Sequence, residues 1–105
     1  MNFEIVYTDN FAKEVKRLAK KYRSLKSDLS DLIESLEEKP NQGVPIGNDC
    51  YKIRMSIKSK GKGKSGGAGI ITHIYIDGAT VFLLSIYDKV TISDKELNAI
   101  LKHLS

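Results

Sequence analysis

The sequence predicts a small α+β domain: a mainly antiparallel sheet with a helical hairpin packed on one face. Two observations favour this class. First, one short strand-like stretch is followed by two stretches with apolar residues at helical spacing. Second, three later stretches alternate with the two-residue period of strands. The chain has 105 residues, the length of one domain, so we expect residues 1–105 to form a single unit in the order β-α-α-β-β-β-α.

The first three elements are read from the N-terminal 40 residues. "FEIVYT" at 3–8 alternates as a strand does, and Thr8 or Asp9 can cap the helix that follows. The next helix starts near residue 25 and ends before Pro40. The short link between the helices predicts an antiparallel hairpin. The expected apolar stripes are Phe11, Val15, Leu18 and Tyr22 in the first helix, and Leu25, Leu29, Leu32, Ile33 and Leu36 in the second.

Three strands are predicted in the second half of the chain. Residues 39–49, with two prolines and two glycines, are expected to form an ordered loop. The strands follow at 50–58, 68–76 and 80–89, the last two joined by a tight turn at 77–79. Alternation places on the core side Tyr51, Ile53, Met55 and Ile57, then Ala68, Ile70, Thr72, Ile74 and Ile76, then Phe82, Leu84 and Ile86. "SDKE" at 93–96 is a capping box, which predicts a last helix with the narrow apolar stripe Leu97, Ile100, Leu101 and Leu104.

Basic residues are concentrated in two segments. Residues 50–76 hold six basic side chains and no acid, and residues 13–26 hold seven against one acid. A single run of like charge is usually a solvated face. Two runs in one small domain favour a polyanionic partner such as nucleic acid.

Several kinds of chemistry are disfavoured. "GKS" at 63–65 is not a P-loop, because the spacing requires glycine where Lys58 stands and because a strand, not a helix, is predicted next. The two histidines and Cys50 do not have the spacing of metal ligands, so we expect neither metal nor cofactor. One cysteine allows no intrachain disulfide, and no signal peptide or membrane span is recognised, which favours a cytoplasmic protein with no membrane partner.

Polar side chains gather on the predicted sheet face away from the helices. Alternation places there Lys52, Arg54, His73, Tyr75 and Tyr87, together with Gly69, which has no side chain. An arginine and a lysine can neutralise a phosphate, a histidine can exchange protons near neutral pH, and a tyrosine can stack on a base or transfer a proton. Taken singly, the histidine can equally be a structural hydrogen-bonder, the tyrosine a packing residue and the arginine half of an ion pair.

The whole chain resembles the RelE/ParE superfamily of toxins from type II toxin–antitoxin modules, most closely its RelE/HigB-like branch. The resemblance rests on "FAKEVKRLAKKY", on "YKIRMSIKSKGKGKSGGAGIITHIYI" and on "VFLLSIYDK". It implies a toxin that cuts translated messenger RNA on the ribosome by metal-free attack of the ribose 2′-OH, and a cognate antitoxin as partner. It also implies catalytic roles for Arg54 and Tyr87. His73 and Gly69, on the same predicted face, complete the four candidate catalytic positions. The RNA-binding side chains are expected to be Lys52, Lys58, Lys60, Lys62, Lys64, Lys16, Lys20 and Arg23.

The sequence departs from the family pattern at Gly69. Relatives with this loop usually read Gly-Gly-Ala-Arg where this chain reads "GGAG". The missing arginine leaves three alternatives open: an inactivating change that Gly69→Arg reverses, a naturally attenuated toxin, or a protein that binds without cleaving. The third includes a catalytically dead relative that binds antitoxin or ribosome, and a ParE-like gyrase inhibitor.

Overall fold

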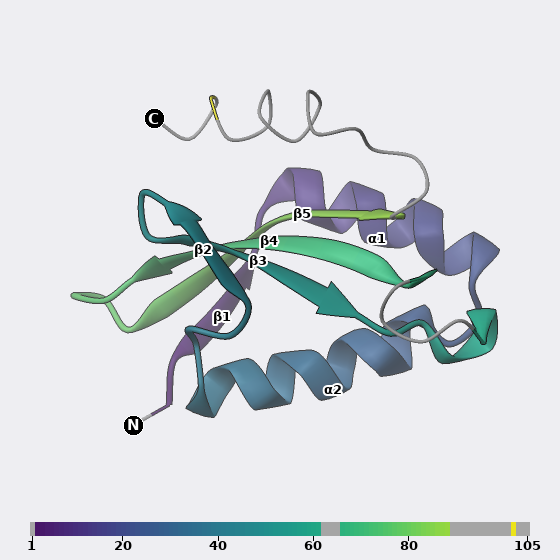
Figure 1. The fold of residues 1–105 in the computed structure, drawn as a ribbon, viewed down its shortest axis with the longest axis horizontal. Coiled ribbons are helices and arrows are strands. Elements are labelled where there is room, and N and C mark those ends of the chain that lie inside the picture. Colours follow the sequence, from purple (N-terminus) through teal and green to yellow (C-terminus); the bar gives the residue numbers. More distant parts are fainter. Residues whose placement is uncertain (1, 62–65, 89–101, 103–105) are drawn as a thin grey trace.

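The computed structural model describes residues 2–61, 66–88 and 102. They form one mixed sheet of five strands with two helices, in agreement with the predicted α+β class (Figure 1). The elements are β1 (Glu4–Tyr7), α1 (Asp9–Lys21), α2 (Leu25–Glu38), β2 (Val44–Gly47), β3 (Cys50–Met55), the short 3₁₀ helix η1 (Lys58–Lys60), β4 (Ala68–Tyr75) and β5 (Thr80–Asp88). The predicted last helix at 93–104 lies outside the described residues, apart from Lys102.

The spatial order of the strands is β1-β5-β4-β3-β2. The three strands predicted as consecutive antiparallel neighbours, β3, β4 and β5, pair as expected, while β1 joins the far side of β5 in parallel. Apolar side chains of both helices and of the sheet share one core, which confirms that the hairpin packs on the sheet.

The first helix is fixed to β5 by polar contacts at its N-terminal end. Thr8 is the N-cap: its hydroxyl oxygen accepts from the backbone N–H of Phe11 at 3.2 Å, and the hydroxyl donates to the carbonyl of Leu83 at 2.8 Å. Glu14 is the one acid of the basic segment 13–26. Its carboxylate accepts from the Ser85 hydroxyl at 3.0 Å and from the backbone N–H of Ile86 at 3.4 Å. The Glu14 side chain therefore hydrogen-bonds to β5 at residues 85 and 86, beyond Leu83, where the pairing with β1 ends.

The prediction of a loop at 39–49 missed the edge strand β2. Val44–Gly47 pairs with the start of β3, and Pro45 is tolerated there because an edge strand has one side without a partner. The two-residue connection, Asn48-Asp49, has φ values of 54° and 59°. Two successive positive φ values are typical of a type I′ hairpin turn, and asparagine and aspartate are among the residues that adopt them.

The predicted core face of β5 was wrong in its first half. Ile71 pairs with Ser85 while Thr72 pairs with Leu83, so Leu84 is the extra residue of a β-bulge. The bulge moves Val81 and Leu83 to the core and leaves Phe82 and Leu84 only half-buried; Ile86 lies in the core as predicted. Ile76, also assigned to the core, lies past the end of β4 and is 68% exposed.

Candidate functional site

The sheet face away from the core carries rows of residues that the strand register fixes. Arg54 pairs with Gly69, and Gly69 pairs with Tyr87, so one row crosses β3, β4 and β5. We call Arg54, Gly69 and Tyr87 the outer row. Three of the four predicted catalytic positions therefore lie on one face, as alternation predicted, and the strand register makes them direct neighbours.

The remaining predicted catalytic residue, His73, lies in a different row. It pairs with Cys50 on one side and Phe82 on the other. Four residues along a strand span about 13 Å, so His73 is well separated from Gly69. Its Nδ1 is 3.5 Å from the Cys50 Sγ, and its ring is tilted against that of Phe82 at 6.4 Å. Burial, and secondarily Asp49, raise the pKa of the Cys50 thiol, so this pair does not provide a thiolate at neutral pH.

Arg54 is the exposed cation of the outer row. No ion pair found among the described residues includes it. Together with Lys52 and Lys58 it lines one wall of an open cleft of about 630 Å³ between β3 and α2. Asp28 and Asp31 lie on the α2 side of this cleft, and Leu32, Ile53 and Met55 supply its apolar surface.

Tyr87, by contrast, is buried, with 5% of its surface exposed. A Cβ built on Gly69 would lie 2.5 Å from both the Cε2 and the hydroxyl oxygen of Tyr87. The phenol thus occupies the space directly over Gly69, where the side chain of any other residue at position 69 would begin.

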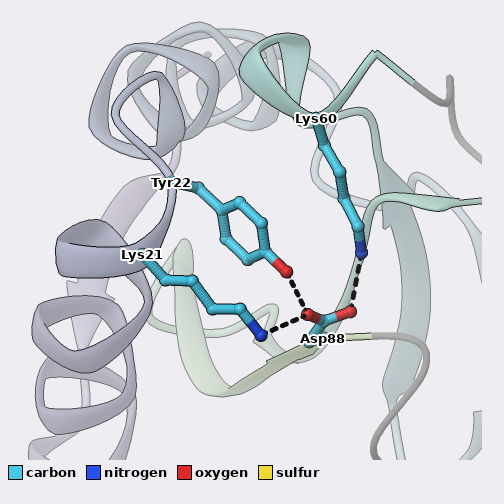
Figure 2. A network of polar contacts seen from close by, with 4 residues as sticks. All are labelled: Lys21, Tyr22, Lys60 and Asp88. Atoms are coloured by element: carbon cyan, nitrogen blue, oxygen red, sulfur yellow. Dashed lines mark hydrogen bonds and ion pairs between the residues drawn. The ribbon is translucent and has the colours of Figure 1, made fainter.

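The next residue, Asp88, points to the opposite side, where three described side chains contact its carboxylate (Figure 2). The Lys60 ammonium lies 2.8 Å from its Oδ1, the Tyr22 hydroxyl donates to its Oδ2, and the Lys21 ammonium is 3.8 Å from the same oxygen. We call Lys21, Tyr22, Lys60 and Asp88 the inner network. The Asp88 and Lys60 side chains are only 5% and 12% exposed. The hydrogen bond to Asp88 raises the pKa of Lys60, so its charge persists at physiological pH.

The inner network was not predicted from the sequence. Lys60 was assigned to RNA, but in the structure its ammonium contacts Asp88 and lies 5.2 Å from the centre of the Tyr22 ring. One signal could have found it. Asp88 follows Ile86 by two residues, so alternation places its carboxylate on the core side, where an acid requires a partner.

The remaining predicted RNA-binding side chains are dispersed. Lys16, Lys20 and Arg23 line a second open cleft of about 530 Å³ on α1, which no residue of the outer row lines. Lys58 is exposed, with Asp31 3.8 Å away. Lys62 and Lys64 lie outside the described residues.

The start of the lysine-rich loop (residues 58–67) is held on its α2 side as well, at Lys58 and Ser59. Asp28, 5% exposed, accepts on Oδ2 from the Ser24 hydroxyl at 2.7 Å and from the backbone N–H of Lys58 at 3.1 Å. The backbone N–H of Ser59 donates to the Ser24 hydroxyl oxygen at 2.8 Å. Residues 58–60 are thus held between two buried carboxylates, those of Asp28 and Asp88.

Within the described residues, no three His, Cys, Asp or Glu side chains come together as metal ligands, and no helix is long and apolar enough to cross a membrane.

The comparisons identify the fold. No family model and no curated protein sequence matches the chain. Among solved structures, the chain has the fold of RelE toxins, as the sequence resemblance implied.

Three of these structures illustrate how similar the fold is. A double arginine-to-alanine mutant of the E. coli toxin RelE, in the free state, gives a TM-score of 0.71 at 18% identity, with 100% of each chain covered. The M. tuberculosis toxin–antitoxin complex RelBE2 gives 0.62 at 14%, covering 84% of this chain and 99% of that one. The same E. coli mutant bound to an antitoxin RelB peptide gives 0.55 at 21%, covering 94% and 93%.

Proposed function

We propose that this protein is the toxin of a toxin–antitoxin module and cuts messenger RNA on the ribosome with the outer row as its phosphate site. The observation that carries the proposal is Arg54: an exposed guanidinium on β3, beside Gly69 of β4, with no acid paired to it among the described residues. The fold shared with RelE toxins supports the same reading.

The proposed chemistry needs charge stabilisation above all. The ribose 2′-oxygen attacks the adjacent phosphorus, the bond from phosphorus to the 5′-oxygen breaks, and a 2′,3′-cyclic phosphate and a 5′-hydroxyl result. Negative charge builds on the non-bridging oxygens during attack. A guanidinium such as that of Arg54 can donate to two of these oxygens at once, and Lys52, two residues earlier on the same strand face, adds a second cation.

Two proton transfers accompany this reaction: one from the 2′-hydroxyl and one to the leaving 5′-oxygen. Tyr87 is the group of the outer row that can take part in them. With 5% of its surface exposed, Tyr87 must first move off Gly69 to meet RNA. His73, about 13 Å along the strand, is too distant to serve the same phosphate.

The proposed protein partner is a cognate antitoxin. Three of the structural neighbours come from toxin–antitoxin complexes. Among the described residues, β2 pairs only with the first half of β3, so no described strand covers the edge from Ile53 to Met55, beside the cleft that Arg54 lines. An antitoxin segment that adds a strand there would also cover the cleft. Co-purification with a small acidic protein encoded beside this one is the expected result.

The second candidate function is binding without cleavage. Position 69 carries no cation and Tyr87 is buried, so the chain as written has one exposed cation in the outer row. A catalytically dead protein that occupies the ribosome or titrates an antitoxin fits that observation. The ParE-like gyrase alternative is less favoured, because Arg54, Lys52 and the lysine-rich loop suit RNA.

The deciding experiment measures cleavage of a defined messenger on programmed ribosomes. The proposal expects cleavage by this chain or by its Gly69→Arg variant, and loss of that cleavage on Arg54→Ala. Ribosome binding with no cleavage by either chain would favour the second candidate.

A further inference from the structure

Two tyrosines of this protein lie against a glycine, and their surroundings differ. A Cβ on Gly69 would be 2.5 Å from Tyr87 Cε2, and a Cβ on Gly78 would be 2.7 Å from Tyr75 Cε2. Tyr75 is 51% exposed and can swing into solvent, whereas Tyr87 is 5% exposed. A side chain at position 69 therefore forces a buried ring to leave its site, while one at position 78 moves only a surface ring.

We infer that Gly69 is a positioning residue: its missing side chain lets the Tyr87 phenol lie across β4, and any side chain at position 69 turns the phenol out. The hydroxyl and Cε2 of Tyr87 lie equally near the Cβ position, so the far end of the ring reaches across the strand rather than along β5. Gly69 pairs with Arg54 on its other side, so the ring covers the middle of the outer row.

The contributions of Gly69 and Tyr87 to the stability of the fold are expected to depend on each other. Glycine within a strand is unfavourable, because it loses more backbone entropy than other residues and has no side chain to pack. An aromatic ring laid over the glycine from the neighbouring strand restores that packing. Each residue is then favourable only while the other is present.

The pair has a consequence for RNA cleavage, and this part of the inference rests on the proposed function. Gly69→Arg makes two changes at once: it adds a guanidinium and it releases Tyr87. Gly69→Ala makes only the second change. Comparing the two variants therefore separates the effect of the added guanidinium on cleavage from the effect of the released Tyr87 phenol.

The first experiment observes the ring directly. The full chain is labelled with 3-fluorotyrosine, and the ¹⁹F resonances of Tyr87 and Tyr75 are assigned with Tyr87→Phe and Tyr75→Phe. Gly69→Ala is expected to move the Tyr87 resonance toward that of free 3-fluorotyrosine and to leave Tyr75 unchanged, while the control Gly78→Ala moves only Tyr75. A Tyr87 resonance that Gly69→Ala leaves in place would overturn the inference.

The second experiment does not depend on the single variant folding well. Gly69→Ala is expected to lower the melting temperature of the parent chain but to raise it in a Tyr87→Ala background, where no ring opposes the new methyl. The sign change is the signature of the pair. An equal fall of melting temperature in both backgrounds would mean that position 69 requires glycine for a reason other than Tyr87.

Cleavage on programmed ribosomes then separates the inference from the proposed function. Gly69→Ala is expected to raise cleavage above that of the parent, Tyr87→Phe to remove this gain, and Gly69→Arg to exceed both. A rise with arginine but none with alanine would overturn the released-phenol consequence. No cleavage by any variant, with the fluorine and melting results as expected, would sink the proposed function and leave the positioning role intact.

Discussion

Tyr87 and Asp88 are consecutive residues on opposite faces of β5. The two faces differ in whether their charged side chains have partners of opposite charge within the described residues. On the inner side, Asp88 is surrounded by Lys60, Lys21 and Tyr22, so its charge is satisfied within the protein (Figure 2). On the outer side, Arg54 is exposed and has no acid paired to it within the described residues. The difference teaches which of the many basic side chains serve the fold and which remain available to a polyanion.

Removing the acid of the inner network is expected to have the largest effect on stability. Asp88→Asn keeps the shape of the side chain but leaves the half-buried Lys60 ammonium without its counterion. Breaking one side of a buried ion pair costs about 3–5 kcal/mol of unfolding free energy. Urea denaturation followed by circular dichroism measures this cost. A loss below about 1 kcal/mol would show that the network contributes no more than a surface ion pair does.

Removing the lysine of the same pair is expected to cost less, because Asp88 keeps Tyr22 and Lys21. Lys60→Met preserves much of the side-chain stem over Tyr22 and loses one charge-assisted hydrogen bond, worth about 1.5–3 kcal/mol. Since the folded pKa of Lys60 is raised, its contribution is fully present below the ordinary lysine pKa of about 10.4 and is lost as pH rises through the folded value.

Denaturation at pH 7 and above pH 11 measures this dependence. The difference in unfolding free energy between the parent and Lys60→Met should shrink at the alkaline pH. A difference that stays constant across that range would contradict the assignment of the stabilisation to the Lys60 ammonium.

The two faces should also separate in their response to salt. Each cation that neutralises a phosphate of single-stranded RNA contributes about 0.7 to the slope of log affinity against log salt. Lys52→Gln and Arg54→Gln are each expected to flatten the slope for ribosome or ribosomal RNA binding by about that amount. Lys60→Met, the matched control, should leave the slope unchanged, because its charge is already paired. A slope that falls equally with all three variants would erase the distinction between the faces.

The smallest effect is expected at the exposed ion pair of the same loop. Lys58 and Asp31 lie 3.8 Å apart with side chains 73% and 68% exposed. Such pairs contribute less than about 1 kcal/mol. Asp31→Asn should therefore change the urea midpoint only slightly, in contrast to Asp88→Asn, although both acids face a lysine of η1.

The sequence predicted the two strands that carry Arg54 and Gly69, because the alternation around both residues is uninterrupted. It failed at Leu84, because a β-bulge depends on the partner strand and leaves no mark in the strand's own period. It missed β2, since proline and glycine signal a loop and an edge strand tolerates both.

The candidate site was predicted in outline only. Alternation can place Gly69 on the same face as Arg54, but it cannot show that the Tyr87 ring fills the space over the glycine, because that depends on a side-chain torsion. Similarly, the sequence shows Lys60 only as one of four lysines in residues 58–64, with no sign of its partner. Only the fold brings it to Asp88, 28 residues away in the chain.

The central claim is that the outer row is a phosphate site, and the most direct measurement is cleavage of a defined messenger on programmed ribosomes by Gly69→Arg with and without Arg54→Ala. Arg54→Ala is expected to lower the cleavage rate about 10²–10³-fold, as loss of one charge-stabilising donor does, while ribosome association falls by no more than the loss of one phosphate contact. Lys60→Met in the same background should cleave at the unchanged rate. Cleavage that survives Arg54→Ala would contradict the account and place the site elsewhere on the molecule.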